Sequence, residues 1–187
     1  MKYCCQCGAR VALRIPPGDN LPRYVCDVCG SIHYQNPKIV AGCVAVWQER
    51  ILLCRRAIEP RYGLWTLPAG FMENGETTHQ AAARETLEEA CAQVINLTLY
   101  GLFNLPHINQ VYIIFRGELS APEVSAGPES LEAALFTEGE LPWGALAFPV
   151  MRETLRLFCQ DRRTDRYPVR VGDILLGPDR SIQMSSL

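Results

Sequence analysis

The sequence predicts an α/β/α sandwich with a mixed sheet, preceded by a small zinc ribbon. Apolar runs typical of strands lie on both sides of one acidic helical segment within residues 70–92. A second helical pattern follows near the end of the chain, and two Cys-x-x-Cys pairs precede the first strand. We therefore divide the chain into a ribbon (residues 1–35), an α/β domain (residues 36–160) and a C-terminal extension of unassigned role (residues 161–187).

Composition excludes several classes of protein. The 187 residues carry a net charge of −2 and are 48% hydrophobic, which is typical of a soluble globular protein and argues against a nucleic-acid partner. The longest apolar run, residues 39–47, is too short to span a membrane. The cysteines number nine, and we find no secretory signal before them. This pattern favours metal binding in a reducing cytoplasm over disulfide bonds.

The two cysteine pairs predict a zinc site. Each pair has a two-residue gap and is followed by glycine, as in knuckles that hold one tetrahedral Zn²⁺. The segment between them is short and rich in proline, so it cannot build a core without the metal. The expected ligands are Cys4, Cys7, Cys26 and Cys29. We interpret the ribbon as a structural clip.

Two residues near this site, Cys5 and His33, are alternative candidates for zinc ligands. Cys5 is a second candidate for the first ligand, but only Cys4 has the usual two-residue gap to Cys7. His33 is a further potential ligand. Because four cysteines are already present, we interpret His33 as a packing or linker residue.

The remaining segments alternate between strand and helix patterns. Strands are expected at residues 39–47, 51–58, 64–68, 94–103, 110–119 and 131–136, the first two forming a hairpin. Helices are expected at residues 138–146 and 150–159. The apolar residues 169–176 either cover an edge strand or contact a second subunit. Arg55, Arg56 and Arg61 are equally compatible with a phosphate clamp and with a solvated strand end.

The central helix carries an unusual density of negative charge. Thr77 and Gln80 match a capping box, which places the helix start there. Glu85, Glu88 and Glu89 then share one face of about one turn, where like charges repel. A divalent cation removes this repulsion, and oxygen ligands select Mg²⁺ or Mn²⁺.

This stretch resembles the Nudix box, in which Gly, Glu, Arg and three further Glu residues have fixed spacing. The matching positions are Gly70, Glu76, Arg84, Glu85, Glu88 and Glu89. The sequence departs from the pattern where the box ends in Gly-aliphatic, because Cys91 and Ala92 stand there, and Thr86 replaces an aliphatic residue. Every charged position is kept, so we expect the chemistry to survive and the helix end to differ.

The resemblance implies a fold and a chemistry. Nudix enzymes are α/β/α sandwiches that hydrolyse a nucleoside diphosphate linked to another moiety. By that resemblance Glu85, Glu88, Glu89 and the Gly70 carbonyl bind magnesium, and Arg84, paired with Glu76, holds the carboxylates. The general base is left open between Glu85, Glu89, Glu129 and Glu132. A homodimer is expected from the resemblance alone.

The substrate is a small nucleotide whose identity is less constrained. Members specific for NADH carry an SQPWPFPxS signature after the box, which this chain lacks. Residues 105–112, LPHINQVY, resemble the type acting on FAD or ADP-ribose. His107 in this stretch is either a substrate contact or a solvated loop residue. The alternatives are an NAD(H) pyrophosphatase or RNA-cap-removing enzyme and, from another class, a catalytically dead sensing or nucleic-acid-binding module.

Overall fold

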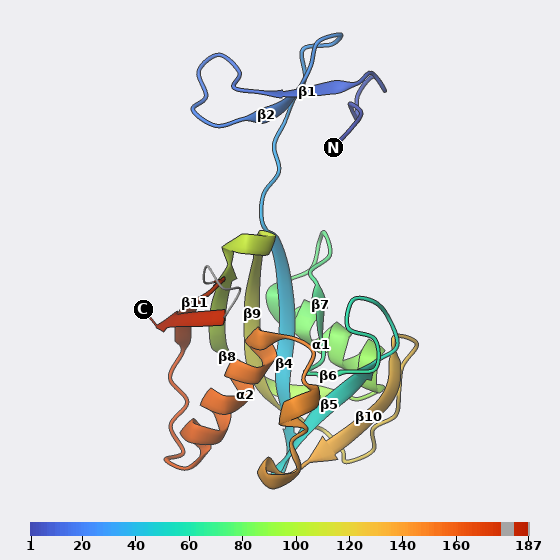
Figure 1. Ribbon diagram of the computed structural model, residues 1–187. Helices are drawn as coiled ribbons and strands as arrows, with labels where there is room; N and C mark the ends of the chain where they lie inside the picture. Colours follow the sequence, from blue (N-terminus) through green and yellow to red (C-terminus); the bar gives the residue numbers. More distant parts are fainter. Residues whose placement is uncertain (177–181, 187) are drawn as a thin grey trace. The chain divides into compact units, whose positions relative to one another are not determined.

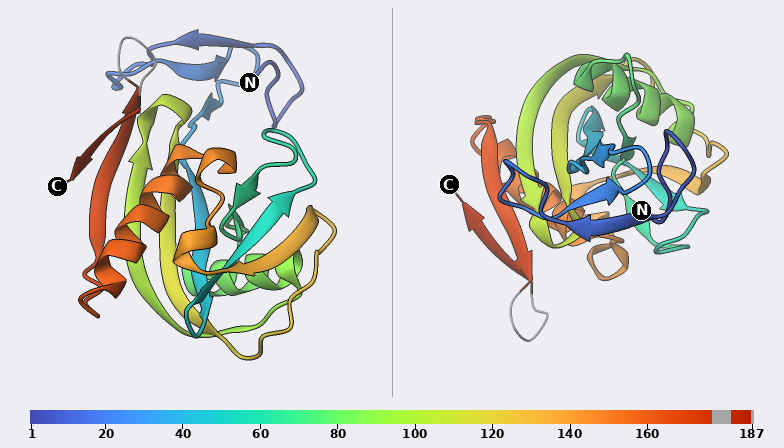
Figure 2. Two further views of the ribbon diagram at one scale, coloured as in Figure 1. Left: turned by 60° about the horizontal axis from the view of Figure 1, so that its bottom comes forward. Right: turned by 90° about the horizontal axis from the view of Figure 1, so that it is seen from above.

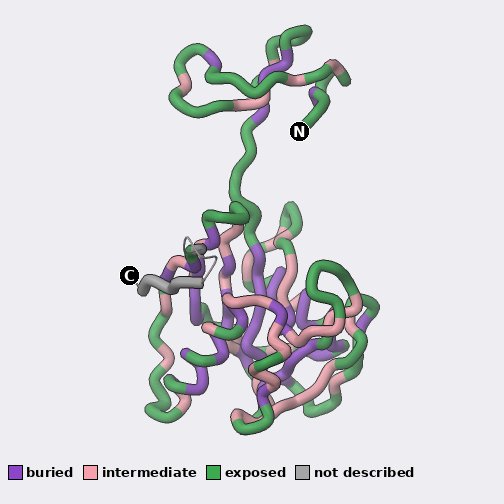
Figure 3. The backbone as a smooth tube through the Cα atoms, in the orientation of Figure 1, coloured by how far each residue is buried: buried purple, intermediate pink, exposed green. Residues whose placement is uncertain are grey.

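A computed structural model describes residues 1–176 and 182–186. It contains two compact units, Met1–Pro37 and Lys38–Leu187, which are described separately. Residues 34–39, where one unit passes into the next, are exposed throughout (Figure 3). Among the described residues, no helix is long and apolar enough to cross a membrane.

The N-terminal unit is a three-stranded antiparallel sheet. Its strands are β1 (Val11–Arg14), β2 (Arg23–Cys26) and β3 (Ile32–His33), in the order β1-β2-β3. The first cysteine pair precedes β1, and the second begins at Cys26, the last residue of β2, so the pairing of β1 with β2 brings the two pairs together.

The second unit is built on one mixed sheet. Its strands are β4 (Lys38–Trp47), β5 (Arg50–Arg56), β6 (Trp65–Thr66), β7 (Ala69–Phe71), β8 (Val94–Leu105), β9 (Gln110–Leu119), β10 (Ser130–Phe136), β11 (Arg170–Leu176) and β12 (Ile182–Ser186). The order is β10-β5-β4-β9-β8-β11-β12, with β6 beside β5 and β7 beside β4. The pairs β4–β9 and β8–β11 are parallel and the others antiparallel.

Two helices cover opposite faces of this sheet, as the views in Figures 1 and 2 show. On one face, α2 (Pro149–Arg162) buries Leu155 and Phe158 in the larger hydrophobic core. On the other face, α1 (Thr78–Ala90) packs through alanines, with Ala81 and Ala82 beside Phe115. The small side chains let α1 lie close to the sheet. The predicted α/β/α sandwich is confirmed.

The predicted helix over residues 138–146 is wrong. This segment holds two separate 3₁₀ turns, η2 (Glu138–Glu140) and η3 (Trp143–Ala145). Pro142 lies between them, and because proline lacks an N–H and restricts the residue before it, a continuous helix cannot form. A third such turn, η1 (Pro106–Ile108), joins β8 to β9.

The segment after α2 covers an edge strand, one of the two alternatives for the apolar residues 169–176. β11 pairs in parallel with β8. The buried carboxylate of Asp161, near the end of α2, accepts a hydrogen bond of 2.8 Å from the Tyr100 hydroxyl of β8. Arg170 of β11 forms an ion pair with the same carboxylate. These contacts tie α2 and β11 to the sheet.

The helix α1 ends where the sequence pattern places glycine, although the residue there is cysteine. Cys91 adopts a left-handed conformation with φ 50° and ψ 30°, and its N–H donates to the Leu87 carbonyl. The helix therefore ends as it would with glycine, and the expectation of a different end is wrong. Left-handed backbone is unfavourable for a residue with a Cβ, so Cys91 stores local strain.

We expect Cys91→Gly to stabilise the α/β domain by about 1 kcal/mol, because glycine adopts the left-handed conformation without a Cβ penalty. Chemical denaturation monitors the change. Cys91→Ala is the matched control, since it removes the exposed thiol but retains the Cβ. Equal stability of the glycine and alanine variants would contradict the strain at this position.

Candidate active site and zinc centre

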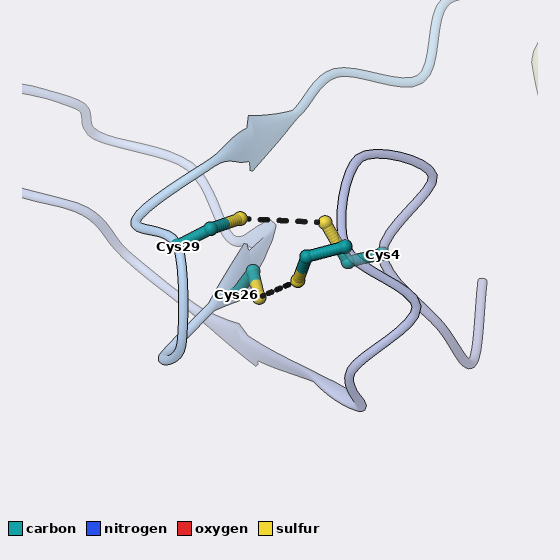
Figure 4. A group of neighbouring side chains, drawn as sticks. Cys4, Cys26 and Cys29 are labelled. Carbon is teal, nitrogen blue, oxygen red and sulfur yellow. Dashed lines mark hydrogen bonds between the residues drawn. The ribbon is translucent and has the colours of Figure 1, made fainter.

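The four cysteines of the ribbon form a compact cluster. Their sulfurs all lie within 4.8 Å of one another. Two contacts are shorter, 3.6 Å between the Sγ atoms of Cys4 and Cys29 and 3.4 Å between those of Cys7 and Cys26 (Figure 4). Four sulfurs bound tetrahedrally at about 2.3 Å from zinc lie about 3.8 Å apart. The cluster therefore fits a structural zinc ion, which Cys4, Cys7, Cys26 and Cys29 would hold.

Backbone geometry explains why each cysteine pair is followed by glycine. Gly8 and Gly30 have φ angles of 74° and 73°. Their N–H groups donate to the carbonyls of Cys4 and Cys26 at 3.0 and 2.9 Å. Glycine closes each tight turn without a Cβ penalty, so both cysteines of a pair point to the same side.

The acidic side chains predicted on α1 lie in different environments. Glu85 and Glu89 are buried, with 8% and 6% of their surface exposed, whereas Glu88 is exposed. The predicted capping box at the start of this helix is present: Thr77 Oγ1 accepts from the Gln80 N–H, and the Gln80 side chain accepts from the Thr77 N–H. The capping box defines where the helix begins, and therefore which face of the helix carries the carboxylates.

Arg84 connects three glutamates, Glu76, Glu85 and Glu88. Its Nη1 donates to Glu85 Oε1 at 2.8 Å and to Glu88 Oε2 at 2.9 Å. Its Nε and Nη2 reach the two oxygens of Glu76 at 3.0 and 2.8 Å. The expected pairing of Glu76 with Arg84 is thus present, and these hydrogen bonds lower the pKa of Glu76 to about 2. Within the described residues the α1 carboxylates form no compact group like that of the cysteines.

Glu89 is the least satisfied of these carboxylates. Burial raises its pKa to about 8, and the charge of Glu85 adds to this effect. Its Oε2 is buried without a hydrogen-bond partner among the described residues. The Cys54 thiol, on β5, lies near Glu89. Burial is the main cause that raises the pKa of this thiol, and the charge of Glu89 raises it further. A buried, bare carboxylate oxygen beside a second carboxylate is the electrostatic setting that a cation stabilises.

Gly70 makes room for this arrangement. A Cβ at Gly70 would lie 2.4 Å from the carboxylate atoms of Glu85. Glycine is therefore the residue that lets Glu85 lie directly against the backbone of β7. Burial likewise raises the pKa of Glu85 above its usual value, against the effect of Arg84. Both features fit a divalent cation among Gly70, Glu85 and Glu89.

A loop far along the chain holds the end of α1. The N–H of Gly127 donates to the Glu89 carbonyl and that of Ser125 to the Ala90 carbonyl, both at 3.0 Å. A Cβ at Gly127 would lie 1.6 Å from the Glu88 carbonyl oxygen, so only glycine allows this approach. The loop satisfies helix carbonyls that have no partner within the helix. No local pattern in the sequence signals this role of Gly127.

The two carboxylates considered as bases outside α1 lie in different elements: Glu129 is in the turn before β10, and Glu132 is on β10. The charge of Glu129 raises the pKa of both Glu85 and Glu89. Glu132 is exposed and lies 3.9 Å from Arg55. The electrostatics therefore associate Glu129, rather than Glu132, with the α1 carboxylates.

The three arginines that precede Gly70, which are Arg55, Arg56 and Arg61, lie in different environments. Arg56 donates from Nε to the Pro60 carbonyl at 2.9 Å, stacks 5.1 Å from the Phe148 ring, and its charge lowers the pKa of Glu89. Arg55 instead bonds the Gly63 carbonyl. Arg61 is exposed. Of the three, Arg56 is the one placed electrostatically at the acidic centre.

His107 and His79 show no contact with the α1 carboxylates among the contacts of the described residues. His107, in η1, is exposed. The ring of His79 lies 4.4 Å from that of Phe115 and packs on the sheet. Neither the exposure of His107 nor the ring contact of His79 identifies a catalytic role.

The fold and these two groups of residues define a class of protein: a zinc ribbon joined to an α/β/α domain whose central helix presents a carboxylate-rich centre. Family models agree. A zinc-ribbon model described as Nudix N-terminal matches residues 2–35, and the NUDIX domain model matches residues 36–158. The chain therefore belongs to the NUDIX family.

Curated relatives include proteins named NAD-capped RNA hydrolase NudC. The chain is 31% identical over 162 residues to the one from Vibrio vulnificus (strain CMCP6), covering 83% of this chain and 59% of that protein. It is 32% identical over 144 residues to the one from Salmonella heidelberg (strain SL476), covering 75% and 53%. The chain thus spans less than two thirds of the length of these relatives.

A solved structure is more similar. The crystal structure of a NUDIX hydrolase from Nitrosomonas europaea is 52% identical, has a TM-score of 0.89, and the match covers 93% of this chain and 99% of that one. An ADP-ribose pyrophosphatase from Streptococcus suis shares the fold at 20% identity, with a TM-score of 0.60 and coverage of 73% and 99%.

We expect a zinc chelator to unfold residues 1–35 while the α/β domain stays folded, because the ribbon lacks a core of its own and the two units are separately compact. Hydrogen exchange read by mass spectrometry should show lost protection in the ribbon alone, and added zinc should restore it. Unchanged exchange in the ribbon after zinc loss would contradict a structural role for the metal.

We expect Glu89 to destabilise the magnesium-free protein as pH rises. Its folded pKa of about 8 lies above the unfolded value of about 4.3, so the free energy of unfolding falls between these pH values and is level above them. Glu89→Gln removes this fall. The variant should be more stable than the wild type by on the order of 4 kcal/mol near pH 8 and equal to it near pH 4.

Denaturation of both proteins across this pH range in magnesium-free buffer measures the difference. Glu123→Gln, an exposed carboxylate in the loop after β9, is the control. Parallel pH profiles for wild type and Glu89→Gln would show that Glu89 is not destabilised by burial.

Proposed function

We propose that this protein hydrolyses the pyrophosphate bond of a nucleoside diphosphate derivative with the help of Mg²⁺ or Mn²⁺. The observation that carries the proposal is the buried Glu89, whose Oε2 lacks a hydrogen-bond partner among the described residues. A purely structural helix gains nothing from burying such a group, whereas a cation-binding helix requires it.

The chain's own residues have distinct roles in this proposal. Glu85, Glu88 and Glu89, with the Gly70 carbonyl, would hold the cation, which supplies charge neutralisation and a bound water of lowered pKa. Arg84 positions Glu85 and Glu88 through its Nη1 hydrogen bonds and is itself positioned by Glu76.

A carboxylate must also accept the proton of the attacking water. Glu85, Glu89 and Glu132 remain candidates for this general base. The electrostatic association of Glu129 with both buried carboxylates favours it as the loop candidate.

Arg56 provides a phosphate contact in this proposal. Its Nε is held by the Pro60 carbonyl and its guanidinium lies over Phe148, which fixes the side chain. None of the ion pairs found among the described residues includes Arg56. A preorganised guanidinium near a carboxylate-rich centre can hold an anionic substrate there.

The substrate is ADP-ribose or FAD in our proposal, giving AMP with ribose 5-phosphate or FMN. The stretch LPHINQVY at residues 105–112 supports this choice. A second candidate, NAD(H) or NAD-capped RNA, is favoured by the names of the curated relatives. The two candidates share the reaction at phosphorus and differ in the group attached to the ADP or AMP moiety.

Product analysis with ADP-ribose, FAD, NADH and NAD-capped RNA side by side, with Mg²⁺, tests the proposal. We expect ADP-ribose or FAD to be cleaved with the highest kcat/KM, and Glu89→Gln to lower kcat about 100-fold or more without loss of fold. Higher efficiency on NADH or capped RNA would select the second candidate. Wild-type turnover by Glu89→Gln at saturating Mg²⁺ would refute the site.

A further inference from the structure

His33 lies beside the cysteine cluster and engages both of its ring nitrogens. Its side chain is 9% exposed, on β3, where it pairs with Tyr24 of β2. His33 Nε2 lies 3.2 Å from Cys4 Sγ, and Nδ1 lies 3.6 Å from Cys5 Sγ. The ring thus stands between a sulfur of the four-cysteine cluster and a sulfur outside it.

The chemistry of a zinc ligand fixes the direction of both contacts. A cysteine bound to zinc is a thiolate, which accepts hydrogen bonds but has no proton to donate. Nε2 of His33 must therefore carry the proton that points at Cys4. A neutral imidazole has one donor and one acceptor, so Nδ1 accepts, and the remaining donor is the thiol of Cys5.

We propose that His33 is a positioning residue of the zinc centre, donating Nε2–H to the Cys4 thiolate while the contact of its Nδ1 with Cys5 Sγ orients the ring. The inference depends on zinc occupying the four-cysteine cluster. It gives His33 a role that is neither a direct ligand nor simple packing, and it separates the functions of the adjacent residues Cys4 and Cys5.

Burial explains why Cys4 needs this donor. Cys4 and Cys26 are 3% and 0% exposed, whereas Cys7 and Cys29 are exposed to water. A buried anion is costly unless hydrogen-bond donors replace the lost water. Cys4 Sγ receives the backbone N–H of Gln6 at 3.4 Å together with His33 Nε2.

Other donors serve the exposed side of the cluster. The hydroxyl of Ser31 lies 3.1 Å from Cys29 Sγ, where water also has access. Of the two buried sulfurs, that of Cys4 is the one contacted by a side chain other than cysteine among the hydrogen bonds of the described residues, and that side chain is His33. Partners of this kind around a metal site raise affinity, and their loss typically weakens binding about 10- to 100-fold.

The first test is the proton position in the zinc-loaded, full-length wild type. Long-range ¹H–¹⁵N correlation spectra distinguish the ring tautomers. We expect the proton of His33 on Nε2. A proton on Nδ1, as for a histidine that binds zinc through Nε2, or protons on both nitrogens, would overturn the proposal even if no variant folds.

The second test compares His33→Gln with His33→Met. The two side chains have similar length and volume, but only glutamine keeps a donor near the position of Nε2. We expect His33→Met to release zinc to a chromophoric chelator about 10-fold faster than wild type or more, and His33→Gln to stay within about 3-fold. Equal release rates for the two variants would overturn the proposal.

Cobalt substitution adds a readout that packing alone does not change. Loss of an N–H···S bond makes the thiolate a stronger donor, so the sulfur-to-cobalt charge-transfer band of His33→Met should move to lower energy and that of His33→Gln should not. Cys5→Ala should keep one zinc per chain, and loss of zinc from this variant would show that Cys5 is a ligand.

Discussion

Repulsion among carboxylates on one turn of α1 is the constraint on which the α/β domain depends. Glu85 and Glu89 are buried side by side, and burial raises the pKa of each. One cation, Arg84, offsets part of this charge by bridging Glu85 and Glu88, and Glu76 holds Arg84 in turn. The neighbouring backbone has glycine at two points of close approach: a Cβ at Gly70 would meet the Glu85 carboxylate, and one at Gly127 would meet the Glu88 carbonyl.

The end of α1 shows how distant segments serve this constraint. Glu89 lies one residue before the end of the helix, where intrahelical hydrogen bonds run out. The loop between β9 and β10 supplies the missing donors, and Gly127 approaches so closely that the helix end cannot rotate without a clash. Together with the capping box, this contact holds two buried acids in a defined place.

Local patterns in the sequence predicted the parts that depend on local physics. The capping box of Thr77 and Gln80, the acidic face and the cysteine knuckles each lie within a few residues, so spacing alone is informative. The contact of Gly127 with α1 joins residues far apart in the chain, and no periodicity signals it. The helix predicted over residues 138–146 does not form. Pro142 breaks it, although the pattern of the residues around Pro142 resembles that of a helix.

The cysteine cluster and the α1 carboxylates differ in how their buried anionic atoms are hydrogen-bonded, and this difference fits a structural role for the first and a functional role for the second. In the ribbon, the buried Cys4 sulfur has donors in the Gln6 N–H and His33. In the α/β domain, Glu89 Oε2 has none among the described residues. Because protein donors satisfy the first anion, its metal can be held permanently. The second remains short of a partner, so under the proposed function it would bind and release a cation together with a phosphorylated substrate.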